Sequence, residues 1–192
     1  MTDLAERRGV ETEVYQPAED SALLAGVAVE HVGSDDRVLE VGTGSGWIAE
    51  RVREETGAFV VASDLNPHAC LQAAERGLPA VQADLVSSFR DAAFDVVVFN
   101  PPYLPEDAAA ARDDWMERAL SVGESGRAVV EPFLDAVERV LAPGGYVLVL
   151  VSSLTGVEDV VEFAGERGFS VVAVREESFP FETLSVLKLL PP

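Results

Sequence analysis

The chain has 192 residues, of which 34 are acidic and 14 are basic, so its formal net charge is −20 at neutral pH. This length suits a single domain with a buried core and no need for disulfide or metal crosslinks. Because only one cysteine and two histidines are present, we expect neither a disulfide framework nor a metal site.

The hydropathy pattern and the charge indicate a cytoplasmic protein. Residues 1–10 are charged and lack the apolar segment of a signal peptide, and no run approaches the roughly 18 apolar residues of a membrane span. An acidic surface disfavours nucleic acid as a partner. Acidic residues are also spread along the whole chain and Lys188 is the only lysine. This composition indicates adaptation to a high-salt cytoplasm, where screening weakens the argument from charge.

The N-terminal part, residues 1–33, is predicted to be a polar lead-in followed by a helix. The apolar stretch Ala22–Val32 follows Asp20 and Ser21, either of which can cap a helix N-terminus. The next few residues are typical of a turn, and they lead into a short predicted strand, Arg37–Val41.

A glycine-rich loop follows this strand. Gly42, Gly44 and Gly46 alternate with other residues, so the backbone can turn tightly and approach a ligand closely. The spacing differs from the dinucleotide fingerprint and from the phosphate-binding P-loop. Because Glu40 precedes the loop and no lysine lies nearby, a cationic ligand fits better than a polyphosphate.

Two further strands are predicted to end near acidic residues. The strand 59–63 precedes Asp64, which can accept both hydroxyls of a ribose or, alternatively, cap the next helix. The brief strand 78–82 is followed by Asp84 and Leu85. Asp84 can accept from an adenine amino group while Leu85 covers the ring.

The fourth strand, Phe94–Phe99, is followed by Asn100, Pro101, Pro102 and Tyr103. Neither proline has an N–H, so this backbone mainly offers acceptors. A planar NH2 group could donate one hydrogen to the Asn100 side chain and the other to the Pro101 carbonyl, which leaves its nitrogen aimed at an electrophile. Tyr103 could stack on the flat group. The alternative is a strand-terminating turn capped by Asn100.

The remaining segments complete one domain spanning residues 1–192. Residues 104–126 are predicted to be a variable insert beside the site, either a lid or substrate platform or a solvated acidic helix. Beyond it, the pattern predicts two helices and three strands, at 127–141, 157–167, 146–151, 169–175 and 183–190. The β-α alternation predicts an α/β fold with a seven-stranded, mostly parallel sheet, one antiparallel strand near the C-terminus and helices on both faces.

Taken together, the glycine loop, the acidic residues after the strands and the Asn-Pro-Pro-Tyr tetrad resemble the class I S-adenosylmethionine-dependent methyltransferases that act on planar amide or amine nitrogens. Residues 14–21 and 182–188 are similar to the archaeal and eukaryotic branch of the HemK family, which methylates the glutamine of the Gly-Gly-Gln motif in peptide release factors. The similarity covers nearly the whole chain. The family's Gly-Arg loop is matched only by Gly123, Gly126 and Arg127.

The resemblance implies a Rossmann-like class I methyltransferase fold, S-adenosylmethionine as cofactor and protein glutamine-N5 methylation as activity. It implies a cofactor site formed by Ser21, Glu40, Gly42, Gly44, Gly46, Asp64, Asp84, Leu85 and Asn100. It implies a catalytic tetrad formed by Asn100, Pro101, Pro102 and Tyr103. The implied partners are a release factor as substrate and a small zinc-binding activator protein that forms a heterodimer by strand pairing.

The activator would pair with the brief strand 78–82, which is expected at the open edge of the sheet. There, Leu78, Val81 and Phe59 would meet water if nothing covered them. β-augmentation by a small partner, or self-association through the same edge, would cover them.

Other functions remain open. The same tetrad could serve an amino methyltransferase acting on adenine or guanine in nucleic acid, or on protein lysine. A nucleic-acid enzyme needs a basic groove, and the sequence shows no cluster beyond Arg7-Arg8 and Arg51/Arg53. A catalytically silent cofactor-binding module is the third possibility, but such a protein has no physical need for Asn100.

Overall fold

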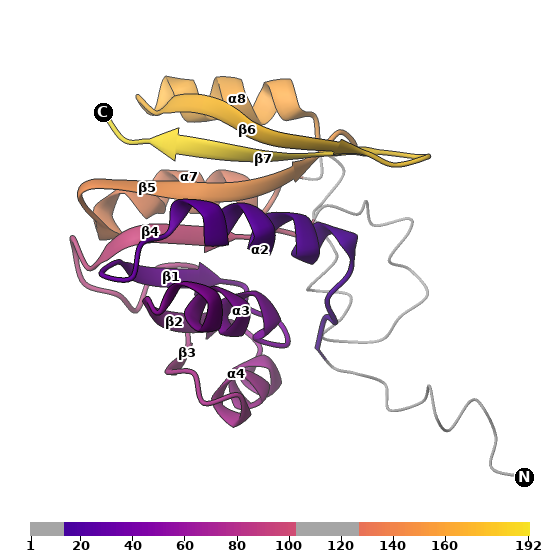
Figure 1. Cartoon of the computed structure of the whole chain (residues 1–192). Coiled ribbons are helices and arrows are strands. Elements are labelled where there is room, and N and C mark those ends of the chain that lie inside the picture. Colours follow the sequence, from indigo (N-terminus) through magenta and orange to yellow (C-terminus); the bar gives the residue numbers. More distant parts are fainter. Residues whose placement is uncertain (1–13, 103–126) are drawn as a thin grey trace, which may run out of the picture.

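The sheet has seven strands in the order β3-β2-β1-β4-β5-β7-β6 (Figure 1). The computed structural model describes residues 14–102 and 127–192, so Tyr103, the insert 104–126 and most of the lead-in lie outside the described residues. The strands are β1 (Arg37–Val41), β2 (Phe59–Asp64), β3 (Ala80–Gln82), β4 (Phe94–Phe99), β5 (Leu141–Ser152), β6 (Ser170–Ser178) and β7 (Thr183–Leu190).

The strand directions confirm the predicted fold. β1 to β5 pair in parallel, whereas β7 runs antiparallel to both of its neighbours, β5 and β6. The chain leaves β1 toward β2 and β3 and then returns to place β4 on the other side of β1, which creates a topological switch point between β1 and β4. Ligands of open α/β sheets bind in the crevice at the carboxyl ends of such strands.

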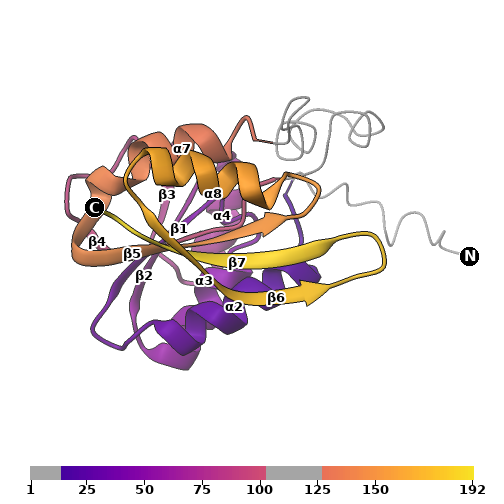
Figure 2. The same cartoon turned by 90° about the horizontal axis from the view of Figure 1, so that it is seen from above.

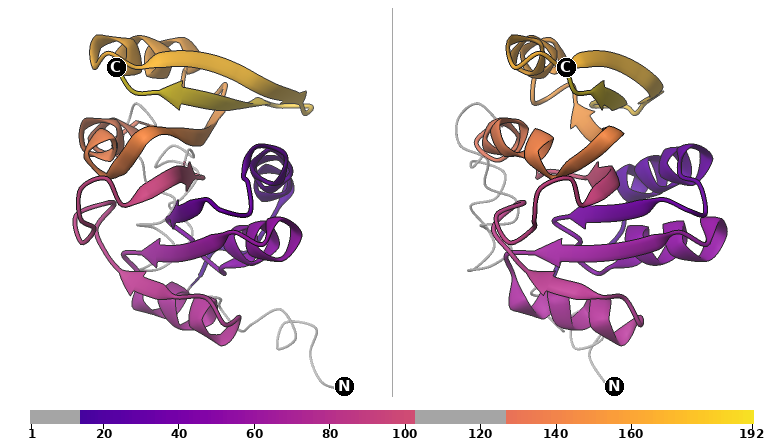
Figure 3. Two further views of the ribbon diagram at one scale, coloured as in Figure 1. Left: turned by 60° about the vertical axis from the view of Figure 1, so that its left-hand side comes forward. Right: turned by 90° about the vertical axis from the view of Figure 1, so that its left-hand side faces the viewer.

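Helices cover both faces of the sheet, as Figure 2 shows from above and Figure 3 from two further directions. Alternate residues of β4 enter two separate cores. The helices are α2 (Glu19–His31), α3 (Trp47–Thr56), α4 (Pro67–Glu75), α7 (Val130–Val137), the 3-10 turn η1 (Glu138–Val140) and α8 (Val157–Glu166). Val96 and Val98 pack in the core that contains α2 and α3, whereas Val97 and Phe99 pack in the core that contains α7 and α8.

Two helix starts differ in detail from the sequence-based expectation. α2 begins at Glu19, and its N-cap residue Ala18 has no side chain that caps, so the prediction that Asp20 or Ser21 caps the helix was wrong. α4 is capped by Asn66, which accepts from the backbone N–H of His68. The alternative role of Asp64 as the cap of this helix is therefore not adopted.

The edge position of β3 is confirmed, but the strand is shorter than predicted and Leu78 is only 4% exposed. Leu78 follows Gly77, which has a φ of +74° at the end of α4. The N–H of Leu78 bonds the carbonyl of Ala73 and that of Gly77 bonds Ala74, a Schellman motif whose residue after the glycine packs inward. Phe59, in contrast, is 58% exposed as expected.

The same motif ends α8, where Phe169 bonds Ala164 and is buried, so β6 begins at Ser170 and not at Phe169. The predicted helix 127–141 is shorter, because only Val130–Val137 is α-helical. β5 starts earlier than predicted. Its register with β4 shifts in the stretch that includes the glycine pair at 144–145. Among the described residues, no helix is both long and apolar enough to cross a membrane, and no cluster of three potential metal ligands occurs.

Candidate active site

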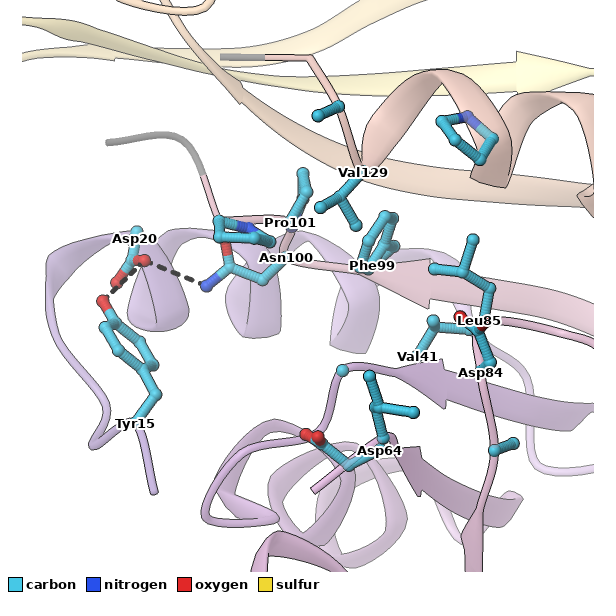
Figure 4. Close-up of a pocket in the computed structure, with 16 residues that line it drawn as sticks. Tyr15, Asp20, Val41, Asp64, Asp84, Leu85, Phe99, Asn100, Pro101 and Val129 are labelled. Carbon is cyan, nitrogen blue, oxygen red and sulfur yellow. Dashed lines mark hydrogen bonds between the residues drawn. The ribbon is translucent and has the colours of Figure 1, made fainter. Parts of the chain in front are cut away.

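A cavity of about 430 Å³ lies at the carboxyl ends of the strands around the switch point (Figure 4). It brings together most of the predicted site residues on the described part of the chain: Gly42, Asp64, Asp84, Leu85, Asn100, Pro101 and Pro102. A smaller cavity of about 30 Å³ beside it is lined by Ser21, Glu40, Gly42 and Asn100, among others. Gly44 and Gly46 line neither cavity, and Tyr103 lies outside the described residues.

The glycines shape the loop after β1. Gly42, Gly44 and Gly46 have φ values of +64°, +52° and +78°, a region that strongly favours glycine. A Cβ on Gly46 would lie 2.9 Å from the Cα of Ala73 in α4, which is too close for a side chain. Gly46 therefore permits helix packing beneath the loop, whereas only Gly42 reaches the cavity wall.

Glu40 is buried beneath this loop. Its carboxylate accepts from the Thr43 hydroxyl and from the backbone N–H of Ala49, at 3.1 Å from the latter. Burial raises the pKa of Glu40 to about 8, and the nearby charge of Asp64 adds to this effect while the two hydrogen bonds oppose it. Glu40 thus supports the glycine loop from beneath. It lines the smaller cavity and does not line the larger one.

Asp64 ends β2 and stands at the wall of the larger cavity. One carboxylate oxygen accepts from the N–H of Gly44 at 2.9 Å and the other from the N–H of Asn66 at 2.8 Å. Burial raises the pKa of Asp64, although the hydrogen bonds from Asn66 and Gly44 counteract the shift. The backbone N–H of Leu65 also donates to this carboxylate, and since a carboxylate offers about four acceptor sites, one remains for a ligand.

Asp84 and Leu85 lie just beyond β3, at the end of the cavity away from Tyr15 and Asp20 (Figure 4). The Asp84 carbonyl accepts from Ser87 in a tight turn, and Leu85 has a φ of +49°. Few non-glycine residues adopt this conformation, and those that do are often found at ligand sites. The turn sets the Asp84 carboxylate and the Leu85 side chain side by side at the rim.

Asn100 lies at the other end of the cavity. There the structure adds Asp20 to the site, a residue for which the sequence had suggested a role as a helix cap. The Asn100 side-chain NH2 donates to the Asp20 carboxylate at 2.9 Å, and the Tyr15 hydroxyl donates to the same oxygen at 2.9 Å (Figure 4). The Asn100 side-chain oxygen is buried and accepts from no donor among the described residues. For a role at this site, the sequence signal for Tyr15 and Asp20 was their place in the segment 14–21.

The larger cavity is acidic. Its described lining includes Asp20, Asp64 and Asp84 but no lysine, arginine or histidine. Apolar side chains such as Val41, Phe99 and Val129 complete the walls. Such a cavity suits a ligand with a flat apolar part, hydroxyl donors and a positive charge better than it suits a phosphate.

Comparisons with known proteins identify the family of this chain. Residues 38–123 match the family described as "Methyltransferase domain". The putative protein N5-glutamine methyltransferase MJ0928 of Methanocaldococcus jannaschii is 34% identical over 91% of this chain and 90% of its own length. The chain belongs to the HemK family of protein N5-glutamine methyltransferases.

Other relatives of this family cover the chain equally well. The human methyltransferase HEMK2 is 29% identical over 94% of this chain and 91% of its own length. In the E. cuniculi Mtq2-Trm112 complex, described as responsible for methylation of the termination factor eRF1, the matching subunit has a TM-score of 0.78 and 31% identity over 94% of this chain. The family resemblance expected from the sequence is therefore confirmed, and the chain is a methyltransferase.

Proposed function

We propose that this enzyme transfers a methyl group from S-adenosylmethionine to the side-chain amide nitrogen of a glutamine in a peptide-chain release factor. The observation that carries the proposal is the side-chain oxygen of Asn100, which is buried and has no donor among the described residues beside a cavity of cofactor size. An unpaired buried acceptor costs about 1 to 3 kcal/mol. A substrate NH2 group would supply the missing hydrogen.

The residues around the larger cavity fit S-adenosylmethionine. Asp64 retains an acceptor site for the ribose hydroxyls, Asp84 can accept from an adenine amino group and Leu85 can cover the ring. The absence of basic side chains from the described lining suits a sulfonium cation. Ser21 and Glu40, which line the smaller cavity, would act from beneath the glycine loop and not by contact with the adenosine.

The bound cofactor supplies an electrophilic methyl group, and the chain's own residues have to position the acceptor nitrogen. An amide nitrogen is a weak nucleophile because its lone pair is delocalised into the carbonyl. Asn100 and the Pro101 carbonyl would each accept one amide hydrogen, which fixes the nitrogen and draws charge onto its hydrogens as the reaction proceeds. Pro102 lines the same cavity, and Tyr103 is proposed to stack on the amide plane. As the N–C bond forms, the S–C bond breaks and the sulfur leaves as a neutral thioether; the nitrogen then loses one proton to water, and no general base is assigned.

A partner subunit forms part of the proposal. β3 has three residues and lies at the open edge of the sheet, and Phe59 on β2 and Leu71 on α4 are exposed by 58% and 62%. Unpaired strand edges and exposed apolar side chains are typical of a surface that another chain covers. We infer that a small activator protein, zinc-binding as the family resemblance implies, extends the sheet at β3.

The decisive experiment is methyl transfer from labelled S-adenosylmethionine to a release factor carrying the Gly-Gly-Gln motif, with the chain alone and co-expressed with an activator. The matched control is the same release factor with the glutamine replaced by alanine. Total RNA and a lysine-rich protein form the other arms. Label on the wild-type release factor alone supports the proposal, whereas label on RNA, on lysine or on the alanine variant contradicts it.

A further inference from the structure

The Asp20 carboxylate is buried, and its acceptor sites are filled by groups of the protein. Asp20 as a whole is 3% exposed. One oxygen accepts from the N–H and the hydroxyl of Ser21, at 2.6 and 3.3 Å, and the other accepts from Tyr15 and Asn100. Since a carboxylate offers about four acceptor sites, none is left for a ligand. Any effect of Asp20 on the reaction must therefore pass through the groups that it holds.

The group that matters for the reaction is the Asn100 amide. Its two ends differ chemically, because the NH2 end only donates and the oxygen only accepts. A carboxylate accepts and cannot donate, so the NH2 end must face Asp20, and the oxygen points away. That oxygen is the buried acceptor that lacks a donor among the described residues.

We propose that Asp20 is a positioning residue that locks the Asn100 amide with its oxygen free to accept from the substrate NH2 group. This inference rests on the proposed function for its catalytic consequence, but the orientation itself is a property of the chain. Without the lock, Asn100 could turn its NH2 end toward the substrate NH2. Two donors would then oppose each other, and the acceptor would be lost.

The test is Asp20→Asn, which changes one charged acceptor into an amide of the same shape. The N–H of Ser21 still needs an acceptor, so the new amide keeps its oxygen there and turns its NH2 end toward Asn100. The Asn100 side chain then has to turn its own oxygen toward that NH2 group, so the orientation of its amide is inverted. We expect kcat to fall by about a hundredfold, with cofactor affinity within about tenfold of wild type.

A double-mutant cycle separates positioning from general stability. If Asp20 acts only through Asn100, Asp20→Asn should cost little further activity in an Asn100→Ala background. The matched control is Asp95→Asn, because Asp95 also accepts several hydrogen bonds, from Arg37, but lies at the opposite end of β4. Asp95→Asn should change thermal stability and leave kcat near that of wild type. Near-normal kcat in Asp20→Asn, or losses that add fully in the double variant, would overturn the inference.

A second measurement does not depend on activity or on the folding of the Asp20 variant. In the nitrogen-15 spectrum of the full chain, the side-chain NH2 pair missing from the Asn100→Ala spectrum belongs to Asn100. We expect one of its protons to be shifted downfield by the carboxylate and protected from exchange with water. If this pair exchanges as rapidly as an exposed asparagine, the lock does not exist. If the protection is present but no release factor is methylated, the proposed function fails while the lock stands.

Discussion

The backbone N–H of Gly44 donates to the Asp64 carboxylate at 2.9 Å, so the loop after β1 is tied directly to the end of β2. The same carboxylate also holds Asn66, the N-cap residue of α4. One side chain thus fixes the glycine loop and the start of a helix, and it still faces the cavity. A change at Asp64 should therefore affect both ligand binding and the local structure.

Replacing Asp64 with alanine should weaken S-adenosylmethionine binding by about 1.5 to 3 kcal/mol, because a charged acceptor for the ribose hydroxyls is lost. Isothermal titration calorimetry measures this difference. Asp64→Asn should weaken binding less, since one acceptor oxygen remains. Asp135→Ala is the control, because Asp135 pairs with Arg167 between α7 and α8 and does not line either cavity. Unchanged affinity in Asp64→Ala would refute the ribose assignment.

Asn100→Ala should lower turnover on the release factor by about a hundredfold or more and change cofactor affinity by less than about tenfold. In the proposed function, the buried oxygen of Asn100 orients the substrate amide, so its loss should affect turnover more than cofactor binding. Single-turnover methyl transfer, combined with a binding titration, separates the two effects. Near-normal turnover would mean that the tetrad is only a turn that ends β4.

Glu40 should make the cofactor-free enzyme less stable as the pH rises. Burial raises its folded-state pKa from 4.5 to about 8, so the folded chain binds more protons than the unfolded chain between these values. The contribution of Glu40 to the free energy of unfolding is complete below about pH 4.5 and is lost as the pH rises through about 8. The loss is on the order of a few kcal/mol.

Urea unfolding at a series of pH values checks this expectation. Glu40→Gln, which cannot ionise, should flatten the pH dependence in this window. Glu162→Gln changes an exposed carboxylate on α8 and should leave the profile as it is in wild type. Identical profiles for wild type and Glu40→Gln would show that Glu40 does not titrate in this range.

Gly46→Ala should destabilise the fold by about 1 to 3 kcal/mol. Its φ of +78° disfavours a side chain, and the new Cβ would lie 2.9 Å from the backbone of Ala73. Gly165→Ala is the matched substitution, since Gly165 lies in α8 with open space around its Cβ position. That change should instead stabilise the chain by about 0.5 to 1 kcal/mol. Urea unfolding that gives the same sign for both variants would contradict this explanation.

Much of the site was predictable because it depends on strand ends. A buried apolar run such as Phe94–Phe99 followed by Asn100 gives both the strand and the position of the side chain at its carboxyl end. The parallel register then brings Val41 level with Phe99 and with Ser63, so residues after three separate strands converge. Neither step requires knowledge of long-range packing.

Two kinds of feature were not predicted. Some depend on contacts between distant segments, and others follow from local motifs that were not recognised. Asp20 and Asn100 are joined by a hydrogen bond across 80 positions, and no local pattern reveals which end of an amide faces which neighbour. Leu78, in contrast, was predictable. A glycine after a helix followed by a large apolar residue is typical of the Schellman motif, which buries that residue.

The edge of β3 offers the last prediction. In parallel pairing, alternate residues of an edge strand bond the neighbouring strand, and those between them point their N–H and C=O groups outward. Pro79 and Ala83 bond β2, so Ala80 has its N–H directed away from the sheet. This N–H is the group that an added strand would use.

Ala80→Pro removes this outward donor and leaves the bonds to β2 in place, so we expect the affinity for the activator to fall by at least about tenfold with little loss of stability. Ala80→Val keeps the N–H and favours a strand, so the complex should persist. Co-purification and sedimentation velocity measure both. The wild-type chain alone should associate with itself or be poorly active, because the edge is uncovered. If it is monodisperse and fully active alone, and Ala80→Pro binds the activator as wild type does, then β3 is not the interface.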